Sequence, residues 1–200
     1  MPYTGEHKQQ SRQRILESAY RLFSSRGYDN VSINEIMNEA SMTRGGFYAH
    51  FENKSALYQE SIRYAASVSG LKQNKPESVD GESWIHTLLE GYLHKQNLDG
   101  ECQCPLASLA TDVAVRDPQI RKAYTETFKG MNAIIQKYVD TYSDCERQGV
   151  MATTAMMIGG LAVARALNDK RLAEELLEAC KQEAINMLNG ATIEDLLVED

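Results

Sequence analysis

Two short helical patterns, separated by only a few residues, constrain the fold of this chain more than any other feature. Ser32 and Glu35 have the spacing of a capping box and open the first pattern. A tight break at Ser41-Met42 follows, and Thr43 can cap the second helix. The apolar residues expected to pack these two helices inward are Ile33, Ile36, Met37, Ala40, Phe47 and Phe51. Two helices of one to two turns joined in this way form a helix-turn-helix arrangement.

Helices are predicted on both sides of this motif. Apolar residues recur every three or four positions from Lys8 to Phe23, and Gly27 suits the left-handed position that ends a helix. Asn53 is expected to cap a longer helix that runs through Ala65-Ala66. We therefore predict a helix-turn-helix domain over residues 1–54, with a fourth helix at 55–72 as the connection.

The rest of the chain predicts a larger helical domain over residues 73–200. The stretch Lys72–Glu82 is typical of a linker, and Pro105 and Pro118 suit first helical positions. The last two helices are expected at about Val150–Leu167 and Leu172–Leu188. No segment shows sustained period-two alternation, so the chain is predicted to be all-α with about nine helices.

Charge is distributed unevenly along the chain. The net charge is −7, but residues 1–74 contain nine basic and seven acidic side chains and carry +2, whereas residues 75–200 carry −9. A cationic excess confined to one segment is expected if only that segment meets phosphate.

The composition is that of a globular chain. The longest apolar stretch, Ala155–Ala164, contains Gly159 and Gly160 and is shorter than a bilayer requires, and the N-terminus does not resemble a secretory signal. We therefore expect a cytoplasmic protein that does not associate with membranes. The four cysteines are expected to be free thiols.

The second short helix carries side chains suited to DNA. Such a helix enters the major groove with its first residues facing the base edges. Arg44 can bond guanine with two hydrogen bonds, which contributes roughly 1–3 kcal/mol of base discrimination. Gly45 and Gly46 would let the backbone approach DNA closely. Tyr48, His50 and Lys54 could hold phosphates.

These residues also carry a family resemblance. The run Ile33–Ala40 followed by Thr43–Lys54 closely resembles the signature of the tetracycline-repressor (TetR) family of transcriptional regulators, and Arg14–Phe23 with Gly27-Tyr28 resembles its first helix. The resemblance covers about residues 10–64. The rest of the chain is similar to the family only in the number and length of its helices.

The resemblance has two consequences for individual residues. It implies that the residues contacting DNA are Thr43, Arg44, Tyr48, His50 and Lys54, and the expected close approach of the backbone adds Gly45. The chain departs from the family at Ser41, where glycine is common, so this serine must tolerate or avoid a positive φ.

A homodimer is expected, because a helix-turn-helix protein generally reads a palindrome with two copies. The resemblance favours an interface formed by the last two helices, at about residues 150–188. The alternative is that the apolar stripes of these helices are only intramolecular core. The small residues that would allow close helix approach are Ala152, Ala155, Gly159, Gly160 and Ala162.

The middle of the chain is the candidate chamber for a small-molecule effector. Aromatic and thioether side chains provide polarizable surface without a fixed shape. The candidates are Trp84, Tyr92, Tyr124, Phe128, Met131 and Met156. Each could instead be ordinary core. The sequence predicts no cofactor.

Cys102-Gln103-Cys104-Pro105 precedes a predicted helix N-terminus, which stabilises a thiolate. Cys102 and Cys104 are therefore candidate redox sensors, with inert thiols as the alternative. Their Cys-x-Cys spacing differs from common zinc sites, so no metal site is predicted.

Together these features predict a transcriptional regulator, a repressor released from a palindromic operator by a small-molecule or reactive effector. One alternative is a helical ligand-binding or scaffolding protein without DNA affinity. Another is a small all-α enzyme, but the sequence contains no common catalytic motif and no catalytic residue is predicted.

Overall fold

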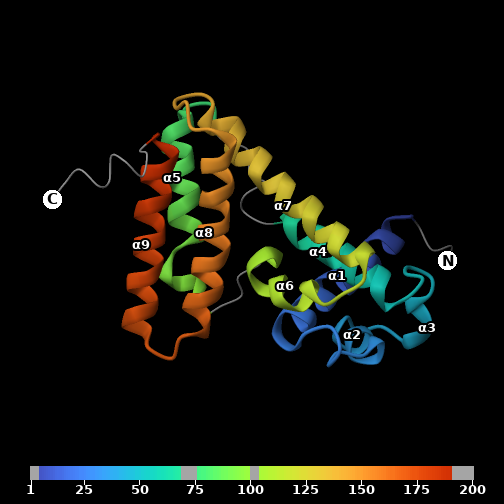
Figure 1. Ribbon diagram of the computed structural model, residues 1–200. Helices are drawn as coiled ribbons and strands as arrows, with labels where there is room; N and C mark the ends of the chain where they lie inside the picture. Colours follow the sequence, from blue (N-terminus) through green and yellow to red (C-terminus); the bar gives the residue numbers. More distant parts are fainter. Residues whose placement is uncertain (1–4, 69–75, 100–103, 191–200) are drawn as a thin grey trace. The chain divides into compact units, whose positions relative to one another are not determined.

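The computed structural model describes residues 5–68, 76–99 and 104–190. Regular structure in these ranges is entirely helical, which confirms the predicted all-α class (Figure 1). The elements are α1 (Gly5–Arg26), α2 (Ile33–Glu39), α3 (Arg44–Phe47), α4 (Lys54–Val68), α5 (Gly81–Tyr92), the 3-10 helix η2 (Lys95–Asn97), α6 (Pro105–Ala114), α7 (Pro118–Val139), α8 (Arg147–Ala166) and α9 (Lys170–Leu188).

The chain forms two compact units that do not follow chain order. The head unit comprises the described residues of Met1–Ser69 and Gln103–Thr127, and the body unit comprises those of Gly70–Cys102 and Phe128–Asp200. The domain boundaries predicted near residues 54 and 73 remain a prediction. In the structure, α6 and the first half of α7 belong with the helix-turn-helix.

The head unit is built around one apolar cluster. Helices α1, α2 and α4 contribute fully buried side chains, and α6 and α7 add Leu109, Val113 and Ile120. Gly27 has a φ of +75° and its amide donates to the Phe23 carbonyl at 2.8 Å, as expected of the residue that ends α1. The members buried most completely are Ile15, Ala19, Phe23, Ile36, Met37, Phe47, Leu57, Tyr58, Ile62 and Ala65.

The capping box that opens α2 is confirmed. The Ser32 hydroxyl accepts from the Glu35 amide at 3.2 Å, and the Glu35 carboxylate accepts from the Ser32 amide at 2.8 Å. The Asn53 side chain likewise caps α4, accepting from the Ala56 amide at 2.8 Å. These contacts are local in sequence, which is why the pattern of residue types predicted them.

The break between α2 and α3 is a Schellman turn with serine in the glycine position. Ser41 has a φ of +56°, its amide donates to the Asn38 carbonyl at 3.0 Å, and the Met42 amide donates to the Met37 carbonyl at 2.8 Å. The sequence left open whether Ser41 tolerates or avoids a positive φ. In the structure Ser41 adopts a positive φ.

The second short helix differs from its prediction. Thr43 occupies the cap position of α3, but its hydroxyl makes no capping hydrogen bond. The helix ends at Phe47, so Phe51 lies beyond it, although both rings are buried. Two glycines in four residues explain the shortness, because glycine is a poor helix former.

The body unit contains α5, α8 and α9, with α8 and α9 side by side (Figure 1). The predicted linker ends two residues too late, because α5 begins at Gly81 and is capped by Asp80, whose carboxylate accepts from the Ser83 amide at 2.8 Å. A Cβ on Gly81 would lie 2.7 Å from the Tyr138 carbonyl oxygen, so only glycine fits there.

Helix α8 is longer than the apolar stretch seen in the sequence. Among the described residues, α8 is the single helix that is long enough and apolar enough to cross a bilayer, judged by length and composition alone. However, 44% of its apolar window is buried inside the protein. Core helices meet the same criterion, so this helix is weak evidence for a membrane span.

Glycine at position 41 should stabilise the head unit. Ser41 is exposed and strained only by its φ, so Ser41→Gly should raise the free energy of unfolding by about 0.5–1 kcal/mol. Ser41→Ala, which keeps the Cβ, should give no such gain. Urea denaturation of both variants tests this, and equal effects of glycine and alanine would contradict it.

Candidate nucleic-acid interface

The start of α3 presents an exposed group of side chains. Thr43, Arg44 and Gly45 are exposed, and Tyr48 is 62% exposed just after the helix. The Tyr48 ring packs edge-on at 5.1 Å against the fully buried ring of Phe47, which anchors α3 in the head core. The structure therefore brings four of the predicted DNA-contacting residues to the surface together, on a helix with a fixed inner side.

The two adjacent glycines differ in their surroundings. A Cβ on Gly46 would be 3.6 Å from the Met42 methyl and 3.7 Å from that of Met37, which is ordinary packing. A Cβ on Gly45 would meet no atom within 4 Å among the described residues. No contact among the described residues requires glycine at position 45, and the missing side chain leaves the backbone open to a close approach from outside.

His50 lies beside two cations that the sequence did not single out. Its ring is half-buried, and its Nδ1 atom is buried without a hydrogen-bond partner in the described structure. Burial lowers the pKa of His50, and the charges of Lys8 and Arg12 lower it further. Both cations come from α1, one turn apart. The spacing of Lys8 and Arg12 is the sequence feature from which this second basic group could have been predicted.

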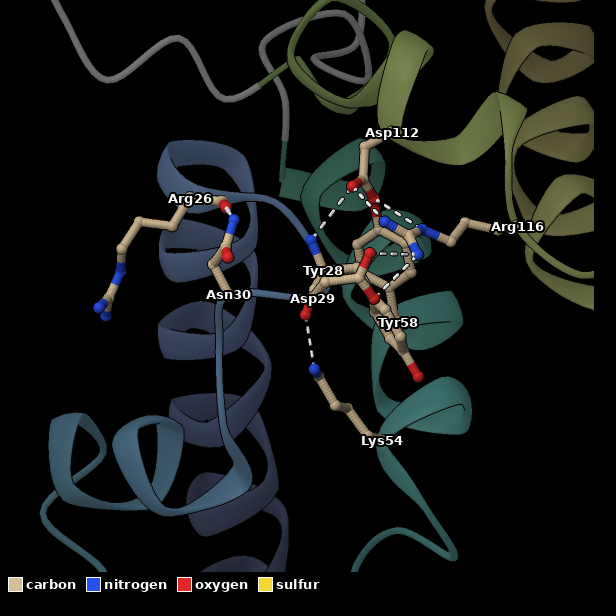
Figure 2. A network of polar contacts seen from close by, with 8 residues as sticks. All are labelled: Arg26, Tyr28, Asp29, Asn30, Lys54, Tyr58, Asp112 and Arg116. Carbon is tan, nitrogen blue, oxygen red and sulfur yellow. Dashed lines mark hydrogen bonds and ion pairs between the residues drawn. The ribbon is translucent and has the colours of Figure 1, made fainter.

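Lys54 is placed differently from the other predicted contacts. Its Nζ atom donates to the Tyr28 carbonyl at 2.5 Å and lies 4.2 Å from the centre of the Tyr28 ring (Figure 2). Burial lowers the pKa of this ammonium group. The charge expected on the phosphate-facing surface is therefore bound to the protein's own backbone.

Tyr28 belongs to a polar network that crosses the head unit (Figure 2). The Asp112 carboxylate, from α6, accepts from the Tyr28 amide at 3.2 Å and from the Tyr58 hydroxyl at 2.5 Å. Arg116 donates to Asp112 at 2.8 Å and to Asp29 at 3.0 Å. Segments separated by more than 80 residues in the chain thus meet at one carboxylate.

The electrostatics of the network favour its charged form. Desolvation raises the pKa of Asp112, but hydrogen bonds from Arg116, Tyr58 and the Tyr28 amide outweigh it, and the net pKa is lowered. The Arg116 pKa is raised, mainly by its hydrogen bond to Asp112. Burial and the contact with Asp112 raise the pKa of Tyr58, so this phenol remains a donor.

The residues predicted to line an effector chamber do not all belong to one unit. Trp84, Tyr92, Phe128, Met131 and Met156 lie in the body unit. Tyr124 instead packs on the apolar cluster of the head, and its hydroxyl donates to the Leu106 carbonyl at 2.7 Å.

The interior of the body unit holds polar atoms without hydrogen-bond partners among the described residues. Trp84 is 8% exposed and its Nε1 atom has no acceptor, and Thr153 is fully buried with an unpaired hydroxyl. The others are His86 Nε2, Gln136 Oε1 and the Tyr142 hydroxyl. Buried polar atoms are normally paired, so these five atoms are exceptions within the described part of the body unit.

The cysteine prediction can be examined at only one of its two positions. Cys102 lies outside the described residues. Cys104 occupies the cap position of α6, as expected, but it is only 7% exposed. Among the described residues, no group of three or more His, Cys, Asp or Glu side chains is placed to hold a metal ion.

Comparison with known proteins places the head in a described family. Residues 15–61 match the model of bacterial regulatory proteins of the tetR family. The HTH-type transcriptional regulator AcrR of Shigella flexneri is 46% identical over 97 residues, which cover 42% of this chain and 43% of that protein. The match thus spans less than half of that relative's length.

Two further similarities extend over most of the chain. The uncharacterised HTH-type transcriptional regulator YxaF of Bacillus subtilis is 25% identical over 167 residues, which cover 80% of this chain and 87% of that protein. The reduced form of Escherichia coli NemR superposes with a TM-score of 0.72 at 18% identity, over 88% of this chain and 96% of that one. At that identity the structural likeness shows a shared fold alone.

The Asp112 network should make stability sensitive to acid. The pKa of Asp112 in the folded protein is below its ordinary value of 3.8. The ionised carboxylate therefore contributes to the free energy of unfolding above pH 3.8, and this contribution is lost as the pH falls through the lower folded pKa. Asp112→Asn should lower the free energy of unfolding at pH 7 by about 1.5–3 kcal/mol and by less as the pH falls below 3.8. Urea denaturation from pH 3 to pH 7 measures this difference. Glu174→Gln, an exposed change on α9, is the control. A destabilisation by Asp112→Asn that stays constant with pH would refute the assignment.

Proposed function

Because the chain belongs to the TetR family of bacterial regulatory proteins, we propose that it is a sequence-specific DNA-binding transcriptional repressor. The observation that carries this proposal is the exposed start of α3. Its exposed residues are Thr43, Arg44, Gly45 and Tyr48, and the buried Phe47 anchors the helix. A helix presented in this way fits the major groove.

The exposed residues suit different parts of a DNA duplex. Arg44 is exposed and has no ion-pair partner in the described chain, so its guanidinium is available for a guanine edge. The hydroxyls of Thr43 and Tyr48 suit phosphates, and Gly45 allows the backbone to approach. Lys8 acts electrostatically on His50, and these two side chains would provide a second group of phosphate contacts.

We also propose that the protein acts as a homodimer through α8 and α9. Met151, Val163 and Leu172 are large apolar side chains on these helices that remain exposed in one copy. Ala155 is also exposed, and Gly159 would carry a Cβ in open space. A second copy packed on this surface would cover these groups and place two heads on one palindrome.

An effector bound in the body unit is proposed to relieve repression. The support is the set of unpaired buried atoms there. Trp84 Nε1 can only donate a hydrogen bond, whereas Gln136 Oε1 can only accept one. A molecule that carries a carbonyl-type acceptor would match the first atom, and one that carries a donor would match the second. We further propose a cytoplasmic location and no enzymatic activity.

Arg44 provides the direct test of DNA reading. Duplexes enriched from a random pool by the full-length protein should bind more tightly than shuffled duplexes, as measured by fluorescence anisotropy. Arg44→Ala should reduce this discrimination by roughly 1–3 kcal/mol. The control is Arg121→Ala, which removes an exposed arginine of α7. A wild-type protein without sequence preference would overturn the proposal and favour a scaffolding role.

The dimer surface can be tested by charge. Val163 is 52% exposed on α8, so Val163→Lys should leave the monomer folded but prevent a second copy from packing there. Sedimentation analysis should show a dimer for the wild type and a monomer for the variant. The control is Val115→Lys, at a side chain that is 76% exposed in the head unit. A variant that remains dimeric would show that the interface lies elsewhere.

A further inference from the structure

The ring of His50 has one nitrogen that is closed to molecules outside the protein. His50 lies just after α3, and its backbone amide donates to the Phe47 carbonyl at 2.9 Å, which fixes the start of its side chain. The ring is half-buried, and its Nδ1 atom is buried without a hydrogen-bond partner among the described residues. A molecule outside the protein must therefore contact this ring through Nε2.

The buried nitrogen favours an uncharged ring. A neutral imidazole carries a proton on one nitrogen only, whereas a charged imidazole carries a proton on both. Charging His50 would thus place a proton on Nδ1, as a buried N–H group with no acceptor among the described residues. An unpaired donor of a charged group is costlier than an unpaired atom of a neutral ring. The favoured form has its proton on Nε2, which is then the donor available to a molecule outside the protein.

Two cations of α1 act on His50 in the same direction. Burial is the largest cause of its lowered pKa, and the charges of Lys8 and Arg12 follow. Arg12 is already engaged, since it forms an ion pair with Glu60 of α4 and its guanidinium lies 4.8 Å from the centre of the Phe51 ring. Arg12 therefore connects α1 to its neighbours in the head, and Glu60 offsets part of its charge.

Lys8 is the cation that remains available. It is exposed one turn before Arg12, and among the described residues it has no ion-pair partner. Since its charge acts on the His50 ring, a phosphate that accepts from Nε2 would lie within the field of this ammonium group. The phosphate itself would favour a charged ring, but burial and the two cations oppose this. The charge at the contact is then supplied by the lysine and not by the histidine.

We propose that His50 binds a DNA phosphate as an uncharged donor through Nε2, and that Lys8 supplies the positive charge at the same phosphate. This inference rests on the proposed function, because it divides a phosphate contact of the DNA-binding head between two side chains. It also adds the start of α1 to the interface, since Lys8 lies before the residues that carry the family resemblance.

Salt dependence separates the two roles. A cation that neutralises a phosphate releases counterions, so its removal makes the slope of log K against log salt shallower by about 1 for each copy on the duplex. Removing an uncharged donor weakens binding but leaves the slope unchanged. The experiment measures fluorescence anisotropy of the full-length protein at several KCl concentrations, on a duplex enriched from a random pool by that protein.

Lys8→Met should weaken binding and make the slope shallower by about 1 for each copy bound. His50→Ala should weaken binding about tenfold with the slope unchanged. His50→Gln, which retains a neutral N–H donor, should bind more tightly than His50→Ala and also keep the wild-type slope. The control is Lys122→Met, which removes an exposed lysine of α7 in the head unit and should match the wild type in affinity and slope.

The pH dependence of binding gives a second measure of the charge on His50. A ring that took up a proton on binding DNA would bind more tightly as the pH falls, by up to about tenfold per pH unit. An uncharged ring takes up no proton at a pH well above its lowered pKa. The affinity of the wild type relative to that of His50→Gln should therefore be the same at pH 7 and at pH 8.

A slope that becomes shallower by about 1 per copy in His50→Gln, or a relative affinity that rises from pH 8 to pH 7, would reveal a charged ring and overturn the proposal. An unchanged slope in Lys8→Met would overturn it as well, because Lys8 would then meet no phosphate. Full affinity in His50→Ala would remove the histidine contact. A wild-type protein that binds no duplex preferentially would instead overturn the proposed function, so the two failures are distinguishable.

Discussion

The pairing of the Asp112 carboxylate is the interaction on which the head unit depends. A partly buried carboxylate is costly unless donors surround it, and here a backbone amide, a phenol and a guanidinium do so. Because Asp112 belongs to α6, the first three helices are not a self-sufficient module. The connecting segment before α2 needs an acceptor that the chain supplies 84 residues later.

Local features of the head could be predicted because they depend on neighbours in the chain. Ser32 and Glu35, Asn53 and the glycine at position 27 each make contacts within a few residues, so residue type and spacing were sufficient. Where local rules compete, the sequence was less informative. Thr43 has the right type for a cap, yet its hydroxyl does not cap, and α3 ends after four residues.

The candidate site was predicted in part for the same reason. Helical periodicity predicts that Phe47 is buried, and the exposure of Arg44 and Tyr48 on either side of it follows from that burial. The position of Lys54 depends on Tyr28, and that of Tyr124 on Leu106, neither of which periodicity can reveal. The resemblance suggested a role for Lys54 from its place in a motif. The structure shows which atoms its ammonium group actually contacts.

Both units contain buried polar atoms without a hydrogen-bond partner among the described residues, including His50 Nδ1 in the head. In the head, the network around Asp112 gives its donors and acceptors partners within the protein, which fixes one arrangement of the helix-turn-helix. In the body, Trp84 and Thr153 bury polar atoms that no described residue satisfies. Each unpaired group costs roughly 1–3 kcal/mol, so a molecule that paired with one of them would offset that cost. Such a molecule can change operator affinity only to the extent that it binds one arrangement of the protein more tightly than another. The Asp112 network fixes one such arrangement in the head, so an effector that favoured another would have to act against these hydrogen bonds.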